Sequence, residues 1–183
     1  MRKINEIFYS LQGEGFFTGV PAVFVRFSGC NLKCSFCDTQ HESGTMMSDD
    51  DIIREISRYP SRRVILTGGE PSLWIDRELL KRLSGEGFSI SIETNGTRPL
   101  PDDDRIWVTC SPKEGSEIVL KRVNELKIVY TGQEVEKYYK TIRAEHYFLQ
   151  PCSCLNTEET VRYILEHPHW RLSLQTHKLI NIQ

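Results

Sequence analysis

The sequence lacks any apolar run that approaches the roughly 20 residues a membrane-spanning helix needs. It also lacks an excess of one charge, because 23 Lys and Arg residues face 25 Asp and Glu residues, for a net charge of −2. A chain without a basic field is not expected to bind nucleic acid. The residues after Met1 form no apolar signal core, so we expect a soluble, cytoplasmic protein with reduced cysteines and no membrane partner.

The composition, 183 residues of which 39% are hydrophobic and 26% charged, suits a single domain over residues 1–183. Apolar β-branched runs alternate with segments of helical period, which predicts an α/β fold on a mainly parallel sheet. The expected strands are 22–27, 64–67, 89–93, 106–109, 126–129, 147–149 and 172–174. The expected helices are 50–59, 78–83, 134–139 and 158–166. We expect Thr157 to cap the last helix, with Leu165 among its inward residues.

Three cysteines, Cys30, Cys34 and Cys37, stand on one short segment after the first expected strand, and no fourth cysteine lies nearby. Three thiolates can hold a 4Fe-4S cluster and leave one iron open to a substrate or cofactor. The alternative is a closed Cys3His zinc site completed by His41. The segment alone leaves both interpretations open.

Polar motifs follow most of the expected strands, at the strand ends where parallel α/β folds bind ligands. They are Thr67-Gly68-Gly69-Glu70-Pro71, Glu93-Thr94-Asn95-Gly96-Thr97, Cys110-Ser111-Pro112-Lys113 and Gln150-Pro151. Each motif alone could be a simple turn. Their conjunction around the cysteine segment favours an open cluster over zinc.

The cysteine spacing followed by Gly-Gly-Glu-Pro resembles the radical S-adenosylmethionine superfamily. Three further segments resemble the 7-carboxy-7-deazaguanine synthase family: Leu11-Gln12-Gly13-Glu14-Gly15, Cys37-Asp38-Thr39 and Leu174-Gln175-Thr176-His177-Lys178. The resemblance implies a trimmed partial (β/α) barrel. It also implies a carbon-nitrogen lyase that converts 6-carboxy-5,6,7,8-tetrahydropterin to 7-carboxy-7-deazaguanine with loss of ammonia, in queuosine-precursor biosynthesis.

The resemblance assigns roles residue by residue, with no catalytic side chain because the cofactor supplies the radical. Cys30, Cys34 and Cys37 would hold the [4Fe-4S] cluster, and Thr39 would bind Mg2+. The implied S-adenosyl-L-methionine site is Phe36, Asp38, Gly69, Ser111, Pro112, Lys113 and Gln150. The implied substrate site is Gln12, Gly13, Glu14, Arg26, Thr67, Glu93 and Gln183.

The chemistry of two of these residues can be argued directly. Glu14 is an acceptor that suits the donor edge of an aminopyrimidinone, and Arg26 can pair with a carboxylate through its planar fork. The alternative for Arg26 is an ion pair with a nearby acid.

The resemblance also implies a homodimer and an external one-electron reductant such as flavodoxin. Two other functions stay open from the sequence: an enzyme that activates a glycyl radical on a partner protein, and a zinc-stabilised binding module. Cys152 and Cys154 could ligate a metal but are expected to be buried thiols, and Cys110 is expected in the core.

Overall fold

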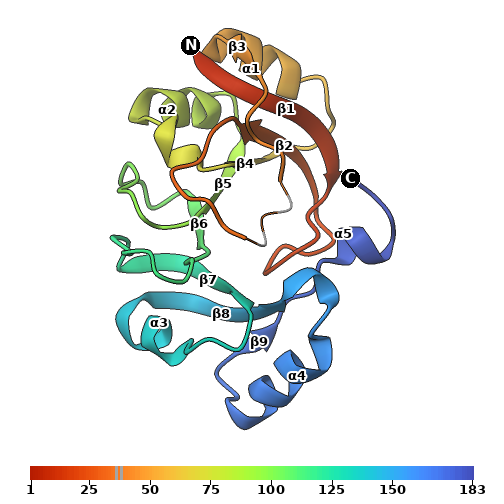
Figure 1. Cartoon of the computed structure of the whole chain (residues 1–183). Coiled ribbons are helices and arrows are strands. Elements are labelled where there is room, and N and C mark those ends of the chain that lie inside the picture. The colour runs from red at the N-terminus through yellow and green to blue at the C-terminus, as the bar shows by residue number, and fades with distance from the viewer. Residues whose placement is uncertain (36, 38) are drawn as a thin grey trace. The chain divides into compact units, whose positions relative to one another are not determined.

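The fold was analysed in a computed structural model that describes residues 1–35, 37 and 39–183 (Figure 1). The chain forms two compact units, each assembled from separate segments. The first unit consists of Met1–Ser10, Pro21–Thr94 and Pro99–Trp107. The second consists of Leu11–Val20, Asn95–Arg98 and Val108–Gln183. The expectation of a single domain over residues 1–183 stays a prediction.

The first unit is built on a mixed sheet with strand order β3-β1-β2-β4-β5. Its strands are β1 (Arg2–Leu11), β2 (Pro21–Phe27), β3 (Thr45–Met47), β4 (Arg63–Gly68) and β5 (Ser89–Thr94). β2, β4 and β5 run parallel, whereas β3 pairs antiparallel with β1. Its helices are α1 (Asp49–Ile56), the short 3-10 turn η1 (Pro71–Leu73) and α2 (Arg77–Gly85).

The helices of the first unit are specified by their caps and by one apolar face. Ser48 forms a capping box with Asp51 at the start of α1, and the Asp76 carboxylate accepts the Leu79 N–H at the start of α2. The apolar faces are fully buried, with Ile52 and Ile56 on α1 and Leu79, Leu80 and Leu83 on α2. Both helices therefore form as their apolar periodicity predicts.

The second unit contains four parallel strands in the order β6-β7-β8-β9. They are β6 (Trp107–Cys110), β7 (Arg122–Tyr130), β8 (Arg143–Pro151) and β9 (Arg171–Leu172). The helical segments are α3 (Glu136–Thr141), the 3-10 turn η2 (Cys152–Cys154), α4 (Thr157–Glu166) and α5 (Thr176–Leu179). Leu126, Ile128 and Leu149 form the centre of its core, together with Trp170 and the expected core thiol Cys110.

Two details of α4 were predicted wrongly. Its N-cap position is Asn156 rather than Thr157, and Thr157 Oγ1 instead donates to the Cys154 carbonyl. Leu165 is 78% exposed, because the helix turns Thr160 inward at 0% exposure and packs Tyr163 and Ile164 against the core. In the part of the chain that the structure describes, no helix has the length and apolar character needed to cross a membrane.

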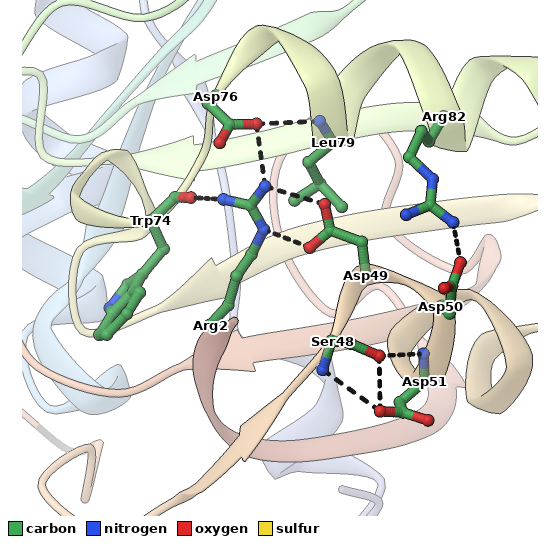
Figure 2. Close-up of polar contacts among 9 residues, drawn as sticks. All are labelled: Arg2, Ser48, Asp49, Asp50, Asp51, Trp74, Asp76, Leu79 and Arg82. Carbon is green, nitrogen blue, oxygen red and sulfur yellow. Dashed lines mark hydrogen bonds and ion pairs between the residues drawn. The ribbon is translucent and has the colours of Figure 1, made fainter.

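A buried arginine joins the start of β1 to both helices of the first unit (Figure 2). Arg2 Nε and Nη2 donate to the Asp49 carboxylate at 2.8 and 3.0 Å, and Nη2 donates to Asp76 at 2.9 Å. Arg2 also donates to the Trp74 carbonyl. The guanidinium thus satisfies two helix-start carboxylates at once, and one of them, Asp76, also caps α2.

We predict that Arg2→Met lowers the free energy of unfolding by about 2–4 kcal/mol, because it removes both guanidinium hydrogen bonds from Asp49, whose side chain is only 14% exposed. The measurement is urea unfolding monitored by circular dichroism. Arg54→Met removes an exposed pair with Asp51 and serves as the control, with an expected change below about 0.5 kcal/mol. Equal effects of the two substitutions would contradict a structural role for the Arg2 network.

Candidate cofactor and substrate sites

The cysteine segment begins directly after β2 and is closed at its base by backbone hydrogen bonds. The Gly29 N–H donates to the His41 carbonyl at 2.8 Å, so the chain leaves and returns at one point. The Glu70 N–H donates to the Gly29 carbonyl at 2.9 Å, and Trp74 Nε1 donates to the Ser28 carbonyl at 2.7 Å. The segment is therefore anchored to the turn that follows β4.

The three thiols are free and reach the surface of this loop, with Cys37 exposed and the other two half-buried. The Leu32 N–H points to Cys30 Sγ at 3.4 Å, the kind of contact that stabilises a metal-bound thiolate. Burial raises the pKa of the Cys30 thiol, and the neighbouring Glu70, Cys34 and Cys37 add to the rise. A bound cationic cluster would supply the positive charge that favours the thiolate form.

The donor set of the cysteine loop fits a 4Fe-4S cluster. Such a cluster gives each thiolate its own iron, so three thiolates on one loop leave one iron open. Among residues 1–35, 37 and 39–183, no three His, Cys, Asp or Glu side chains converge on a single ion.

Gly69 lies against the base of the cysteine loop. A Cβ at this position would sit 2.0 Å from the Gly29 carbonyl oxygen and 3.0 Å from the His41 ring. The resemblance assigns Gly69 to the S-adenosylmethionine site, and in the structure the missing side chain of Gly69 makes room for the cysteine loop. Its N–H already donates to the Phe27 carbonyl at 3.1 Å.

Glu70, the acidic residue of the same turn, is fully buried. Its Oε1 accepts the Ser72 N–H at 3.0 Å and the Thr94 hydroxyl at 2.7 Å. The carboxylate therefore ties the end of β4 to the end of β5.

Three predicted substrate residues form a row across the ends of parallel strands. Arg26 on β2 is in register with Thr67 on β4, and the pairing of Leu66 with Ile92 places Glu93 next along β5. Arg26 Nε donates to Glu6 at 2.7 Å, so the ion pair considered as the alternative is formed. That bond uses one of five guanidinium donors, which leaves the fork of Arg26 able to meet a carboxylate.

In the second unit, the predicted substrate residues lie on a tight loop that the C-terminal segment holds. Thr176 donates to the Gly13 carbonyl through its N–H at 2.9 Å and its hydroxyl at 3.0 Å. A Cβ on Gly13 would collide with the His177 ring at 2.1 Å. The Gln12 side chain accepts the Glu14 N–H at 3.3 Å.

The Glu14 carboxylate is bound at both oxygens. Lys127 Nζ donates to Oε2 at 2.8 Å and Gln175 Nε2 donates to Oε1 at 2.9 Å. Burial alone would raise the pKa of Glu14, but the Lys127 charge and hydrogen bond, the Gln175 bond and the His177 charge outweigh it and hold the pKa at about 2. Glu14 is thus ionised at neutral pH.

The remaining predicted positions fall at other strand ends of the second unit. Ser111, buried Pro112 and Lys113 follow β6, and Lys113 Nζ donates to the Ser111 hydroxyl at 2.8 Å. Gln150 is buried on β8 and accepts the Ser173 hydroxyl at 2.9 Å.

The roles assigned to four further residues stay predictions. Thr39 is half-buried on the cysteine loop, and Gln183 is exposed at the chain end. Phe36 and Asp38 lie outside the described residues. Cys152 and Cys154 are free thiols in the η2 turn, and they are half-buried rather than buried as expected.

The sequence reading missed Lys127, Glu125 and Ser173 as residues that hold the Glu14 loop. A signal was present, because Glu125 and Lys127 are charged residues that alternate with apolar residues in β7, and a charge buried in a strand requires a partner. The partner itself could not be read from the sequence, since Glu14 is 113 positions away.

Comparison with known proteins gives the family. A model of the radical SAM superfamily matches residues 24–144. A 7-carboxy-7-deazaguanine synthase of Bacteroides thetaiotaomicron is 66% identical over 100% of both chains, and that of Bordetella pertussis is 39% identical over 98% of each. The chain belongs to the 7-carboxy-7-deazaguanine synthase family. The crystal structure of QueE from Escherichia coli matches with a TM-score of 0.83 at 32% identity, covering 94% of this chain and 93% of that one.

Membership of the 7-carboxy-7-deazaguanine synthase family confirms the predicted α/β fold class, a partial barrel of the radical SAM type. It also confirms the predicted enzyme class, a radical SAM lyase, and the family cofactors, a [4Fe-4S] cluster and S-adenosyl-L-methionine. The zinc-module and glycyl-radical alternatives are thereby set aside. The Mg2+ site and the residue roles stay predictions.

We predict that Gly69→Ala lowers the free energy of unfolding by about 1–3 kcal/mol, because the added methyl group overpacks the contact with Gly29. The amount of iron bound per chain after anaerobic reconstitution should also fall in Gly69→Ala, because the added methyl group displaces the base of the cysteine loop. Gly85→Ala is the control, because nothing lies within 4 Å of a Cβ there. Normal iron content and stability in Gly69→Ala would show that the contact does not shape the loop.

Proposed function

We propose that this chain converts 6-carboxy-5,6,7,8-tetrahydropterin to 7-carboxy-7-deazaguanine and ammonia. The observation that carries the proposal is that one strand, β2, supplies both Arg26 and the cysteine loop that follows it. A carboxylate-binding cation and an open cluster are what a radical reaction at the carboxylate-bearing carbon requires. When bound, the cluster and S-adenosylmethionine supply the radical that starts the reaction.

The residues of the first unit would bind and orient the substrate, S-adenosylmethionine and Mg2+. Arg26 would hold the substrate carboxylate through the free part of its fork, with Thr67 and Glu93 beside it in the same row. Because the Gly69 N–H is occupied by Phe27, Gly69 would meet the methionine ammonium through its carbonyl oxygen, which is an acceptor. Thr39 would offer one oxygen to Mg2+, an ion that prefers oxygen ligands, and the ion would supply positive charge beside the substrate carboxylate.

Further roles are proposed for residues of the second unit. Ser111 and Lys113 offer a hydroxyl and a cation to the ribose and carboxylate of S-adenosylmethionine, with Pro112 between them, and Gln150 offers an amide to the adenosine. Gln12, Gly13 and Glu14 would face the pterin edge. Phe36 and Asp38 are proposed to contact the adenine, and Gln183 to approach the substrate through its terminal carboxylate.

We further propose a cytoplasmic homodimer served by an external one-electron reductant such as flavodoxin, without a nucleic-acid partner. The charge balance of −2 supports the last point, because it gives no field that would attract nucleic acid. The product would enter the synthesis of queuosine precursors.

The atom balance of the proposed reaction predicts whether S-adenosylmethionine is consumed. Product and ammonia together contain every atom of the substrate, so no oxidant is consumed and S-adenosylmethionine can be regenerated. We expect the anaerobically reconstituted protein, given reductant, to form a deazaguanine with many turnovers per S-adenosylmethionine molecule. Chromatography of product and cofactor measures both. One cofactor consumed per product would contradict the cofactor role, and no product would contradict the function.

We predict that Arg26→Gln weakens binding of 6-carboxypterin about 10- to 100-fold, because a charge-assisted bond contributes about 1.5–3 kcal/mol. Binding of pterin, which lacks the carboxylate, should not change. Quenching of pterin fluorescence measures both. Arg63→Gln is the matched control. Arg63 donates to the Ser91 hydroxyl and lies at the start of β4, away from Thr67 near the end of that strand. An equal loss for both ligands would mean that Arg26 acts only on the fold.

A further inference from the structure

Glu14 is held by two side chains from distant parts of the chain, and neither belongs to the substrate site predicted above. Lys127 comes from the middle of β7, and Gln175 comes from the residue before α5. We propose that Lys127 and Gln175 are positioning residues that fix Glu14 as an acceptor-only group for the donor edge of the bicyclic substrate. The inference deepens the proposed function and rests on its assignment of Glu14 to the pterin edge.

The orientation of the Gln175 amide is fixed by its second partner. Lys178 Nζ donates to Gln175 Oε1 at 3.0 Å. Because an ammonium only donates, the oxygen of the amide faces Lys178 and its NH2 group faces Glu14. Gln175 therefore offers Glu14 a donor in this arrangement.

The backbone around Glu14 is fixed as well. The Gly15 N–H donates to the Ser173 hydroxyl at 2.9 Å, and the Phe16 N–H donates to Glu125 Oε2 at 3.1 Å. A Cβ on Gly15, which has a φ of +65°, would sit 2.0 Å from Glu125 Oε1. Glu125 and Lys127 lie two residues apart on one strand, so the same strand face supports the loop backbone and holds the Glu14 carboxylate.

A carboxylate has about four acceptor positions, and the two protein bonds use two of them. Glu14 keeps a side-chain exposure of 20%, whereas the Lys127 side chain is only 5% exposed. The buried ammonium needs its carboxylate, since an unpaired charge in a strand interior is costly. The remaining acceptor positions of Glu14 suit a ligand edge that presents neighbouring N–H donors, such as the ring N–H and exocyclic amine of an aminopyrimidinone.

The charged groups around Glu14 explain why this acceptor is not lost at mildly acidic pH. Lys127 and Glu125 face the loop from β7, His177 faces it from α5, and Lys178 acts through Gln175. With the pKa of Glu14 at about 2, the carboxylate stays ionised far below neutral pH. Without Lys127, burial would dominate and the pKa of Glu14 would rise, so protonation would turn an acceptor into a donor.

The test compares two ligands that differ only at this edge. 6-Carboxypterin presents an amine where 6-carboxylumazine presents a carbonyl oxygen, and binding of each to the reconstituted holoenzyme can be followed by its fluorescence between about pH 5 and about pH 7. We expect the unchanged protein to prefer 6-carboxypterin by about 10- to 100-fold across this range. In Lys127→Met the preference should shrink as the pH falls and recover as it rises.

A second variant covers the case in which Lys127→Met fails to fold. Gln175→Glu keeps Lys127 and places a second carboxylate against Glu14 Oε1, so the two acids share a proton and lose the preference at the acidic end. Ser173→Ala is the control, since it loosens the same loop at Gly15 without changing a charge. It should weaken the binding of both ligands equally at every pH, and it leaves His177 in place.

The outcomes distinguish a failure of the proposed function from a failure of the positioning role of Lys127 and Gln175. If the unchanged protein binds neither ligand and forms no deazaguanine, the proposed function fails. If it binds 6-carboxypterin and turns over, but Lys127→Met and Gln175→Glu keep an unaltered, pH-independent preference, the positioning role is wrong. If Ser173→Ala reproduces their pH dependence, the effect belongs to loop order and the inference is likewise overturned.

Discussion

A lysine buried in the middle of strand β7 imposes the strongest constraint on the second unit. Lys127 is 4% exposed, and an ammonium in such a place must be paired. Its partner is Glu14, on a loop that precedes it by 113 residues. The pairing draws that loop onto the sheet, where Ser173, Gln175 and Thr176 complete its hydrogen bonds. One electrostatic requirement thereby brings together the two motifs at opposite ends of the sequence.

The first unit holds the loop of thiols at its base. It does so through a close backbone contact, in which Gly69 leaves room for the Gly29 carbonyl and Glu70 donates its N–H to that carbonyl. The buried Glu70 carboxylate then links the same turn to β5 through Thr94. The chain at the base of the loop is therefore fixed, although the thiols themselves are exposed or half-buried.

Much of this architecture could be predicted from local sequence patterns. Apolar runs and amphipathic periods located the central parallel strands and the main helices, and the cysteine spacing located the loop that we propose to hold the cluster. Strand β1 was missed because its residues are mostly half-buried, so it shows neither a continuous apolar run nor strict alternation. Leu165 was misplaced because a ten-residue helix allows more than one choice of inward face. The ion pair of Arg26 with Glu6 was foreseen only as a possibility, since pairing across strands depends on register.

The network around Glu14 could not be predicted from local sequence patterns. The charged residues of β7 signalled a buried polar site, but only the fold identifies which carboxylate meets which cation. The central claim is that this carboxylate, held by Lys127 and Gln175, reads the donor edge of the substrate. A crystal structure of the holoenzyme with S-adenosylmethionine and 6-carboxypterin tests it most directly. The account predicts that the amine and ring N–H of the ligand donate to Glu14 while Lys127 keeps its own bond to that carboxylate. A ligand whose donor edge faces another group, or a Glu14 that leaves Lys127 on binding, would contradict it.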